Sequence, residues 1–174
     1  MVNTVRWGRF KVAYSVHAPK RIKGNHLHLP NFRQRDVHSC GFVAALTVVR
    51  HFGIDVSDKD VLRAVRPSVN WGVNRTGMRQ ALAQLGIEVE HRRNLTVKDL
   101  KEFVRQGAPV IISVWPDGWL NDHWTVVQGF VDDRVHLTNH RSLPIEAFRL
   151  EWSDMDMRNG RGGSGEGLVC PPGW

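Results

Sequence analysis

The stretch that decides the fold is "QRDVHSCGFVAAL", residues 34–46, in which a polar segment gives way to an apolar one. Apolar residues continue to Phe52 and occupy nearly every position rather than a single stripe, and Gly53 follows them. A helix that is apolar on all sides must be enclosed by other elements, and a glycine just past the last turn is a frequent C-terminal signal. The sequence therefore predicts a buried helix over residues 40–52 that begins at Cys40.

Amphipathic helical patterns follow this segment, and short apolar strands come after them. The helical patterns are "DVSDKDVLRAV", "RTGMRQALAQLG" and "TVKDLKEFVRQG", at residues 55–65, 75–86 and 96–107. The predicted strands are "APVIISVW", "HWTVVQGF" and "RVHLTNH", at residues 108–115, 123–130 and 134–140, and "VDD" between the last two is typical of a hairpin turn. Helices first and a mostly antiparallel sheet afterwards indicate an α+β fold with segregated layers.

The length of 174 residues fits one globular domain with a sizeable core. We expect a basic, extended N-terminal arm over residues 1–33, the folded domain over 34–152, and a mobile Gly/Pro-rich tail over 153–174. Residues 1–35 contain eight Lys or Arg residues and no Asp or Glu. Because the arm has no recognisable nucleic-acid motif, a solvated extension is the favoured interpretation, and nucleic acid is not the expected partner.

The two cysteines are far apart in the chain, so they do not suggest a disulfide framework. No apolar run is long enough to span a bilayer, and the N-terminal residues lack the pattern of a secretory signal. We therefore expect a cytoplasmic protein without a membrane partner, in which Cys40 is a free thiol.

Cys40 is placed where a thiol becomes a good nucleophile. The first turn of a helix has a partial positive charge, which favours thiolate over thiol. Gly41 follows directly and lets a substrate approach the backbone closely. The helix start therefore predicts a nucleophile, although a single cysteine in an apolar segment is also compatible with simple packing.

A cysteine nucleophile needs a base, and the base needs a group that orients it. His123 begins one predicted strand and Asn139 ends the next, so a hairpin would place them on neighbouring strands. Asn139 could then accept a hydrogen bond from one imidazole nitrogen of His123 and leave the other facing the thiol. Gln34 lies six residues before Cys40, and its amide could join the Cys40 backbone N–H as an oxyanion donor.

These residues together resemble the papain-like cysteine peptidases. The pattern is glutamine, five residues, then Cys-Gly at the start of a buried helix, followed later by "HWTVVQG" and a polar residue after the next strand. Within that superfamily the chain is most similar to the bacterial double-glycine leader peptidases, over about residues 30–140. The resemblance implies a papain-like α+β fold in which the buried nucleophile helix of an N-terminal helical layer packs on the sheet. It also implies a peptide or protein substrate and no cofactor.

Several alternatives remain open at this stage. A catalytically silent papain-like module that binds a peptide or protein, and an acyltransferase that uses the same thioester chemistry, would both show these residues. Three tryptophans lie near His123 in the sequence, Trp115, Trp119 and Trp124. They are either core residues or a hydrophobic wall of the substrate site, where Gly41 would also contact the substrate. A zinc site built on His26 and His28 is disfavoured, because a structural site needs four ligands.

Overall fold

The computed structural model describes residues 2–17, 25–36, 38–67, 72–115, 123–138, 141–157 and 165–172. Within residues 141–157, side chains are described as far as Trp152. The chain forms two compact units. Unit 1 comprises Met1–Lys20 and His28–Val89, and unit 2 comprises Arg21–Leu27 and Glu90–Trp174. Among the described residues, no helix is both long and apolar enough to cross a membrane.

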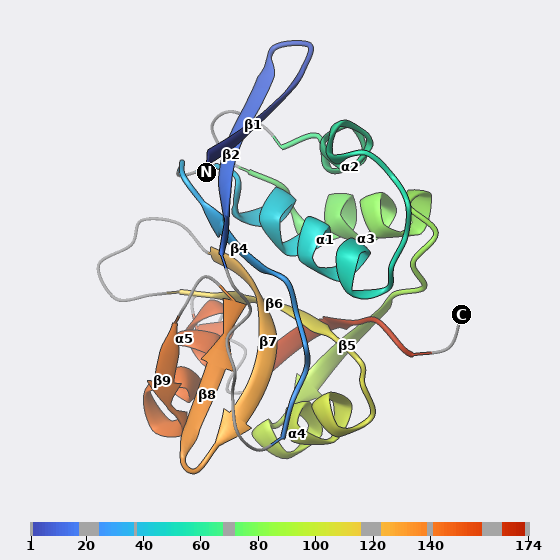
Figure 1. The fold of residues 1–174 in the computed structure, drawn as a ribbon. Helices are drawn as coiled ribbons and strands as arrows, with labels where there is room; N and C mark the ends of the chain where they lie inside the picture. Colours follow the sequence, from blue (N-terminus) through green and yellow to red (C-terminus); the bar gives the residue numbers. More distant parts are fainter. Residues whose placement is uncertain are drawn as a thin grey trace. The chain divides into compact units, whose positions relative to one another are not determined.

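Unit 1 combines an antiparallel sheet of order β1-β2-β4 with helices (Figure 1). Its central element is α1, in which every residue from Cys40 to Val49 is buried. The all-round apolar pattern of the sequence is the reason, since no face of this helix is suited to water. The elements of unit 1 are β1 Val2–Trp7, β2 Phe10–His17, β4 Asn31–Gln34, α1 Cys40–His51, α2 Asp58–Val65 and α3 Arg75–Gln84.

Local capping and one shared carboxylate hold the elements of unit 1 together. Ser57 and Asp60 form a reciprocal capping box at the start of α2. Asp58, the first residue of α2, accepts a hydrogen bond from the Tyr14 hydroxyl of β2. It also forms an ion pair of 2.8 Å with Arg50 of α1. Burial, followed by the hydrogen bond to Asp58, raises the pKa of Tyr14 to about 12, so this phenol stays protonated as a donor.

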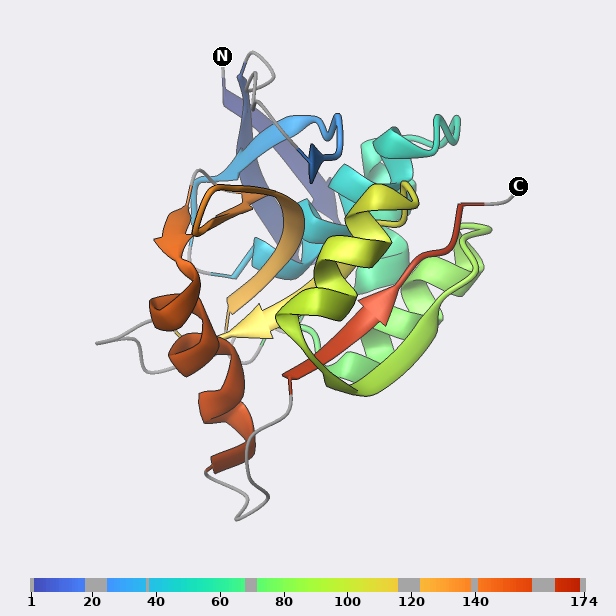
Figure 2. The ribbon, with the colours of Figure 1, turned by 90° about the horizontal axis from the view of Figure 1, so that it is seen from below.

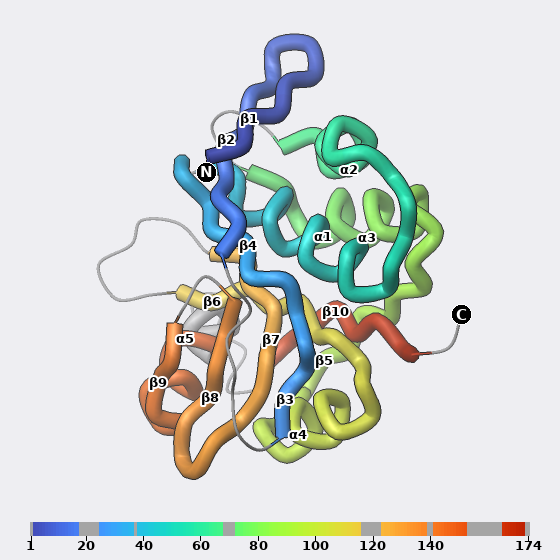
Figure 3. Tube along the Cα trace, in the orientation of Figure 1, coloured from blue at the N-terminus to red at the C-terminus, as the bar shows by residue number. Residues whose placement is uncertain are grey.

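Unit 2 is built on an antiparallel sheet of order β5-β10-β6-β7-β8-β9. The short strand β3 pairs with β7 at Gly129 and Phe130, beyond the residues of β7 that pair with β6 (Figure 3). The strands are β3 Asn25–His26, β5 Glu90–Leu95, β6 Val110–Val114, β7 His123–Val131, β8 Arg134–Leu137, β9 Ser142–Pro144 and β10 Gly165–Val169.

Two helices of unit 2 pack on this sheet, α4 Val97–Arg105 and α5 Ile145–Met157. Helix α4 contacts β7, β3 and β6, whereas α5 contacts β6, β10, β9 and β8 (Figure 2). Strand β7 is buried from His123 to Phe130, so both of its faces are covered. The first eight residues of β7 are therefore held in the core of unit 2.

The predicted α+β class, with an antiparallel sheet, is confirmed. The C-terminal segment differs from the expected mobile tail, since residues 165–169 form β10, which is hydrogen-bonded to both β5 and β6. Gly165 and Gly167 make this possible, because a side chain at Gly165 would overlap the Trp152 ring and one at Gly167 would meet Val110. The glycines of this segment therefore serve close packing rather than flexibility.

The contact between Gly165 and Trp152 leads to the first prediction. A Cβ atom at Gly165 would lie 2.1 Å from Cε2 of Trp152, whose indole N–H donates to the Glu166 carbonyl at 3.0 Å. We expect Gly165→Ala to lower the free energy of unfolding by about 1–3 kcal/mol, measured by urea denaturation. Combining it with Trp152→Leu should cost less than the sum of the two single changes. Strict additivity would contradict this packing.

Candidate active site

Cys40 is the first residue of α1 and has 7% of its surface exposed. The N-cap residue Ser39 is fully buried, and its hydroxyl lies 3.5 Å from the Ala13 carbonyl instead of capping the helix. The first turn of α1 contains no acidic residue. Neither a capping side chain nor an acidic residue within that turn therefore neutralises the positive end of the helix, which favours an anion there.

Gln34 is the last residue of β4, a strand that contacts α1. Its side-chain oxygen Oε1 is buried and has no hydrogen-bond partner among the described residues. The oxygen and nitrogen of an amide are interchangeable by a half-turn of the side chain, so the buried end can equally present the NH₂ donor. A buried amide atom without a hydrogen-bond partner is suited to receive one from a ligand. Gln34, Cys40 and Gly41 all belong to unit 1.

His123 is the first residue of β7 and belongs to unit 2. It is 5% exposed and lies opposite Val114 in the β6–β7 register. Trp115 follows Val114 directly, and its backbone N–H donates to the Glu151 carbonyl at 2.9 Å. Trp124 is buried beside His123 in β7. The structure thus brings the β6 terminus with Trp115 next to His123.

Trp119 and Asn139, also predicted as site residues, lie outside the described residues. The residue before Asn139 is nevertheless well anchored. The Thr138 hydroxyl lies 3.1 Å from the Thr125 hydroxyl and accepts a 3.0 Å hydrogen bond from the Val126 backbone N–H. The chain leading to Asn139 is therefore fixed against β7, two residues along that strand from His123.

An ion pair that the sequence does not predict joins Arg141 to helix α5. Arg141 donates two hydrogen bonds of 2.7 Å to the carboxylate of Glu151 in α5, and its carbonyl accepts from the Leu137 N–H at 2.9 Å. Glu151 is also the residue whose carbonyl holds Trp115. A bidentate, partly buried pair of this kind fixes geometry better than an exposed one. Its partners are ten residues apart, a spacing that carries no sequence signal.

Cys170, the second thiol, has a different environment. It follows β10, is fully buried and, like Cys40, is not in a disulfide. Burial raises the pKa of Cys170 to about 12, because an apolar environment disfavours the thiolate. Cys170 is therefore a structural residue and is not a candidate nucleophile at neutral pH.

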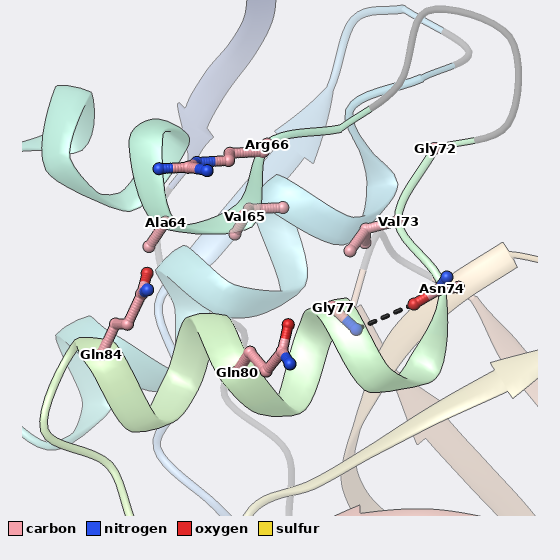
Figure 4. A pocket seen from close by; sticks show the side chains of 9 residues that line it. All are labelled: Ala64, Val65, Arg66, Gly72, Val73, Asn74, Gly77, Gln80 and Gln84. Carbon is pink, nitrogen blue, oxygen red and sulfur yellow. Dashed lines mark hydrogen bonds between the residues drawn. The ribbon is translucent and has the colours of Figure 1, made fainter.

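A cavity of about 390 Å³ lies between α2 and α3 of unit 1 (Figure 4). Arg66, Gln80 and Gln84 contribute polar side chains, and the Asn74 side chain at one end accepts a 2.8 Å hydrogen bond from the Gly77 N–H. The cavity is lined by neither Cys40 nor Gln34. It is therefore separate from the residues predicted to perform chemistry in this unit.

Comparisons with solved structures show the fold. The peptidase domain of Streptococcus ComA, a bifunctional ABC transporter, is similar with a TM-score of 0.59 and 20% identity over 80% of this chain and 96% of that one. A double-glycine motif protease from an AMS/PCAT transporter, solved with its leader peptide, has a TM-score of 0.63 and 17% sequence identity. The match covers 86% of this chain and 96% of that one. A C39-like peptidase from Bacillus anthracis has a TM-score of 0.58 and 14% sequence identity, over 77% of this chain and 88% of that one.

No curated protein matches the sequence. The family comparison does give a match, to the peptidase C39 family over residues 28–157, which is most of the chain. This range includes Gln34, Cys40, His123 and both strands of the β7–β8 hairpin. The chain therefore belongs to the peptidase C39 family, and it is a cysteine peptidase of papain-like fold.

Proposed function

We propose that the chain cleaves peptide bonds with Cys40 as the nucleophile, His123 as the base, Asn139 as the group that orients His123, and Gln34 as an oxyanion donor. The observation that carries this proposal is the position of Cys40 in a peptidase C39 chain. It is the first residue of a buried helix whose first turn contains no acidic residue and whose N-cap side chain does not cap it. Such a helix start stabilises a thiolate.

The reaction follows acyl-transfer chemistry. The Cys40 sulfur attacks the carbonyl carbon of the scissile bond, and His123 takes the thiol proton. The carbonyl oxygen becomes an oxyanion, which accepts from the Cys40 backbone N–H and the Gln34 amide. When the C–N bond breaks, His123 gives its proton to the leaving amine. Water, deprotonated by His123, then attacks the thioester, which releases the acid product and restores the thiol.

The substrate that we propose is a peptide with paired small residues before the cleaved bond. One similar structure is described as a double-glycine motif protease bound to its leader peptide. In the β6–β7 register Val114 lies opposite His123, so Trp124, the next residue of β7, points to the other face of the sheet and does not narrow the site beside His123. We also propose a reducing, cytoplasmic location, because both cysteines are free.

Cleavage of a designed peptide tests this function. We expect the protein to cleave a quenched fluorescent peptide that contains Gly-Gly, and Cys40→Ala to lower the rate by at least about 10⁴-fold. Cys170→Ala is the matched control and should retain cleavage, since that thiol is fully buried and its raised pKa keeps it protonated. A wild-type protein that binds the peptide without cleaving it would indicate a silent module. Transfer of the acyl group to an added amine in place of hydrolysis would indicate an acyltransferase.

Gln34 gives a second test of the mechanism. We expect Gln34→Ala to reduce kcat by about 10²–10³-fold, because it removes one donor to the oxyanion. Its effect on KM should be small, since the oxyanion exists only beyond the ground state. Gln84→Ala is the control, because Gln84 is an exposed glutamine of α3 in the same unit. An unchanged kcat for Gln34→Ala, in a protein that melts like wild type, would remove Gln34 from the site.

A further inference from the structure

One face of the β1-β2-β4 sheet in unit 1 is basic. Arg6 of β1 lies opposite Lys11 of β2, and Arg33 of β4 lies opposite Ser15 of β2. Side chains alternate between the two faces of a strand, so Lys11, Ser15 and His17 point to the same side. The residues that we call the basic face are Arg6, Lys11, His17, Arg33 and Arg35. The other face provides buried Val12, Tyr14 and Phe32 to the core.

The side chains at one end of the basic face form a cluster around Ser15. The Ser15 hydroxyl accepts a 3.0 Å hydrogen bond from Arg35 Nε and lies 2.9 Å from His17 Nε2. Arg33 stands across from Ser15, and its Nε is buried with no hydrogen-bond partner among the described residues. Leaving a buried donor without a hydrogen bond is unfavourable. A ligand that accepts hydrogen bonds would recover this loss.

Among the residues that the structure describes, no carboxylate forms an ion pair with Arg33 or Arg35. Residues 1–35 contain no Asp or Glu, and Asp36 is the first. Both carboxylate oxygens of Asp36 accept from backbone N–H groups, those of Ala13 and His38, at 2.9 Å. Partial loss of hydration, and then the positive charges of Arg33 and Arg35, lower the pKa of His17. Four Lys or Arg side chains on this face, Arg6, Lys11, Arg33 and Arg35, outnumber the one nearby carboxylate of Asp36, so the field on this face is positive.

We propose that the basic face binds an acidic segment of a peptide substrate, with one carboxylate on Arg33 and Arg35 and a second between Arg6 and Lys11. The guanidinium fork matches a carboxylate in a bidentate geometry. Lys11 and Ser15 are four residues apart on β2, which is about 13 Å in a strand. An extended peptide with acidic residues four positions apart spans the same length. The proposal rests on the proposed function only in taking the partner to be a substrate.

Aromatic positions on this sheet favour a polypeptide over a nucleic acid. Trp7 and Phe10 lie on the face opposite to Arg6 and Lys11, where their rings stack with 5.6 Å between centroids. The guanidinium of Arg66 covers Trp7, and that of Arg9 covers Phe10. Among the described residues, the basic face has no Phe, Tyr or Trp on which bases could stack. Strands β1 and β2 also precede the family match, which begins at residue 28.

Fluorescence anisotropy tests the proposal with the full chain as the Cys40→Ser variant, which cannot cleave the probe. The probe is a fluorescein-labelled (Glu-Thr)₅ peptide, and (Gln-Thr)₅ is the neutral reference. We expect (Glu-Thr)₅ to bind and (Gln-Thr)₅ not to bind, and Arg33→Gln/Arg35→Gln to weaken binding at least tenfold. The control Lys59→Gln/Arg79→Gln removes the same charge from exposed positions of the same unit and should change binding less than twofold.

Equal weakening by the two double variants would contradict the proposal, because it would indicate a general effect of net charge. Equal binding of the neutral peptide would also contradict it. A 15-base-pair DNA duplex that binds more tightly than (Glu-Thr)₅, and depends on the same arginines, would identify a nucleic-acid surface instead. Arg33→Glu/Arg35→Glu should bind (Lys-Thr)₅, and failure of this variant with an unchanged melting temperature would overturn the site. Because the variant assayed is inactive, these outcomes are independent of whether the protein cleaves peptides.

Discussion

Enclosure of α1 is the constraint on which unit 1 depends. The helix has no side that can face water over its first ten residues, and Phe42, Val43, Leu46, Val48 and Val49 are completely buried. Helices α2 and α3 and strand β4 all contact it. Close packing makes any shift of this helix costly, because neighbouring side chains cannot fill the space that it leaves. The first residue of the helix is thereby held in a fixed place, which a nucleophile requires.

Strand β7 has the corresponding role in unit 2. It is buried along nearly its whole length, and it begins with His123. The hydroxyls of Thr125 and Thr138 hold the end of β8 against it, and the pair Arg141–Glu151 ties the following segment to α5. Burial of this strand constrains the backbone that carries His123. We interpret the rigidity of α1 and β7 as the preorganisation that the proposed chemistry needs.

The sequence predicted those elements whose signal is local or periodic. The apolar pattern predicts the buried helix from Cys40, and amphipathic patterns predict the helices at α2 and α4, whose N-terminal caps are Ser57 and Thr96. Cys40 and His123 were predicted to begin a helix and a strand, and the structure confirms both positions. Strand β10 was missed because glycines usually signal flexibility, whereas here they admit Trp152 and Val110. The Arg141–Glu151 pair was missed because it depends on tertiary packing.

The rate of alkylation of Cys40 most directly tests the proposed pairing of Cys40 with His123. Iodoacetamide labelling of native protein would be followed by mass spectrometry between pH 5 and 10, in wild type and in His123→Ala. The imidazolium favours the thiolate, so we predict rapid labelling of wild-type Cys40 at pH 6 and at least tenfold slower labelling in His123→Ala. The two rates should converge above pH 9, while buried Cys170 remains unlabelled. Identical rates at pH 6 in the two proteins would contradict the pair.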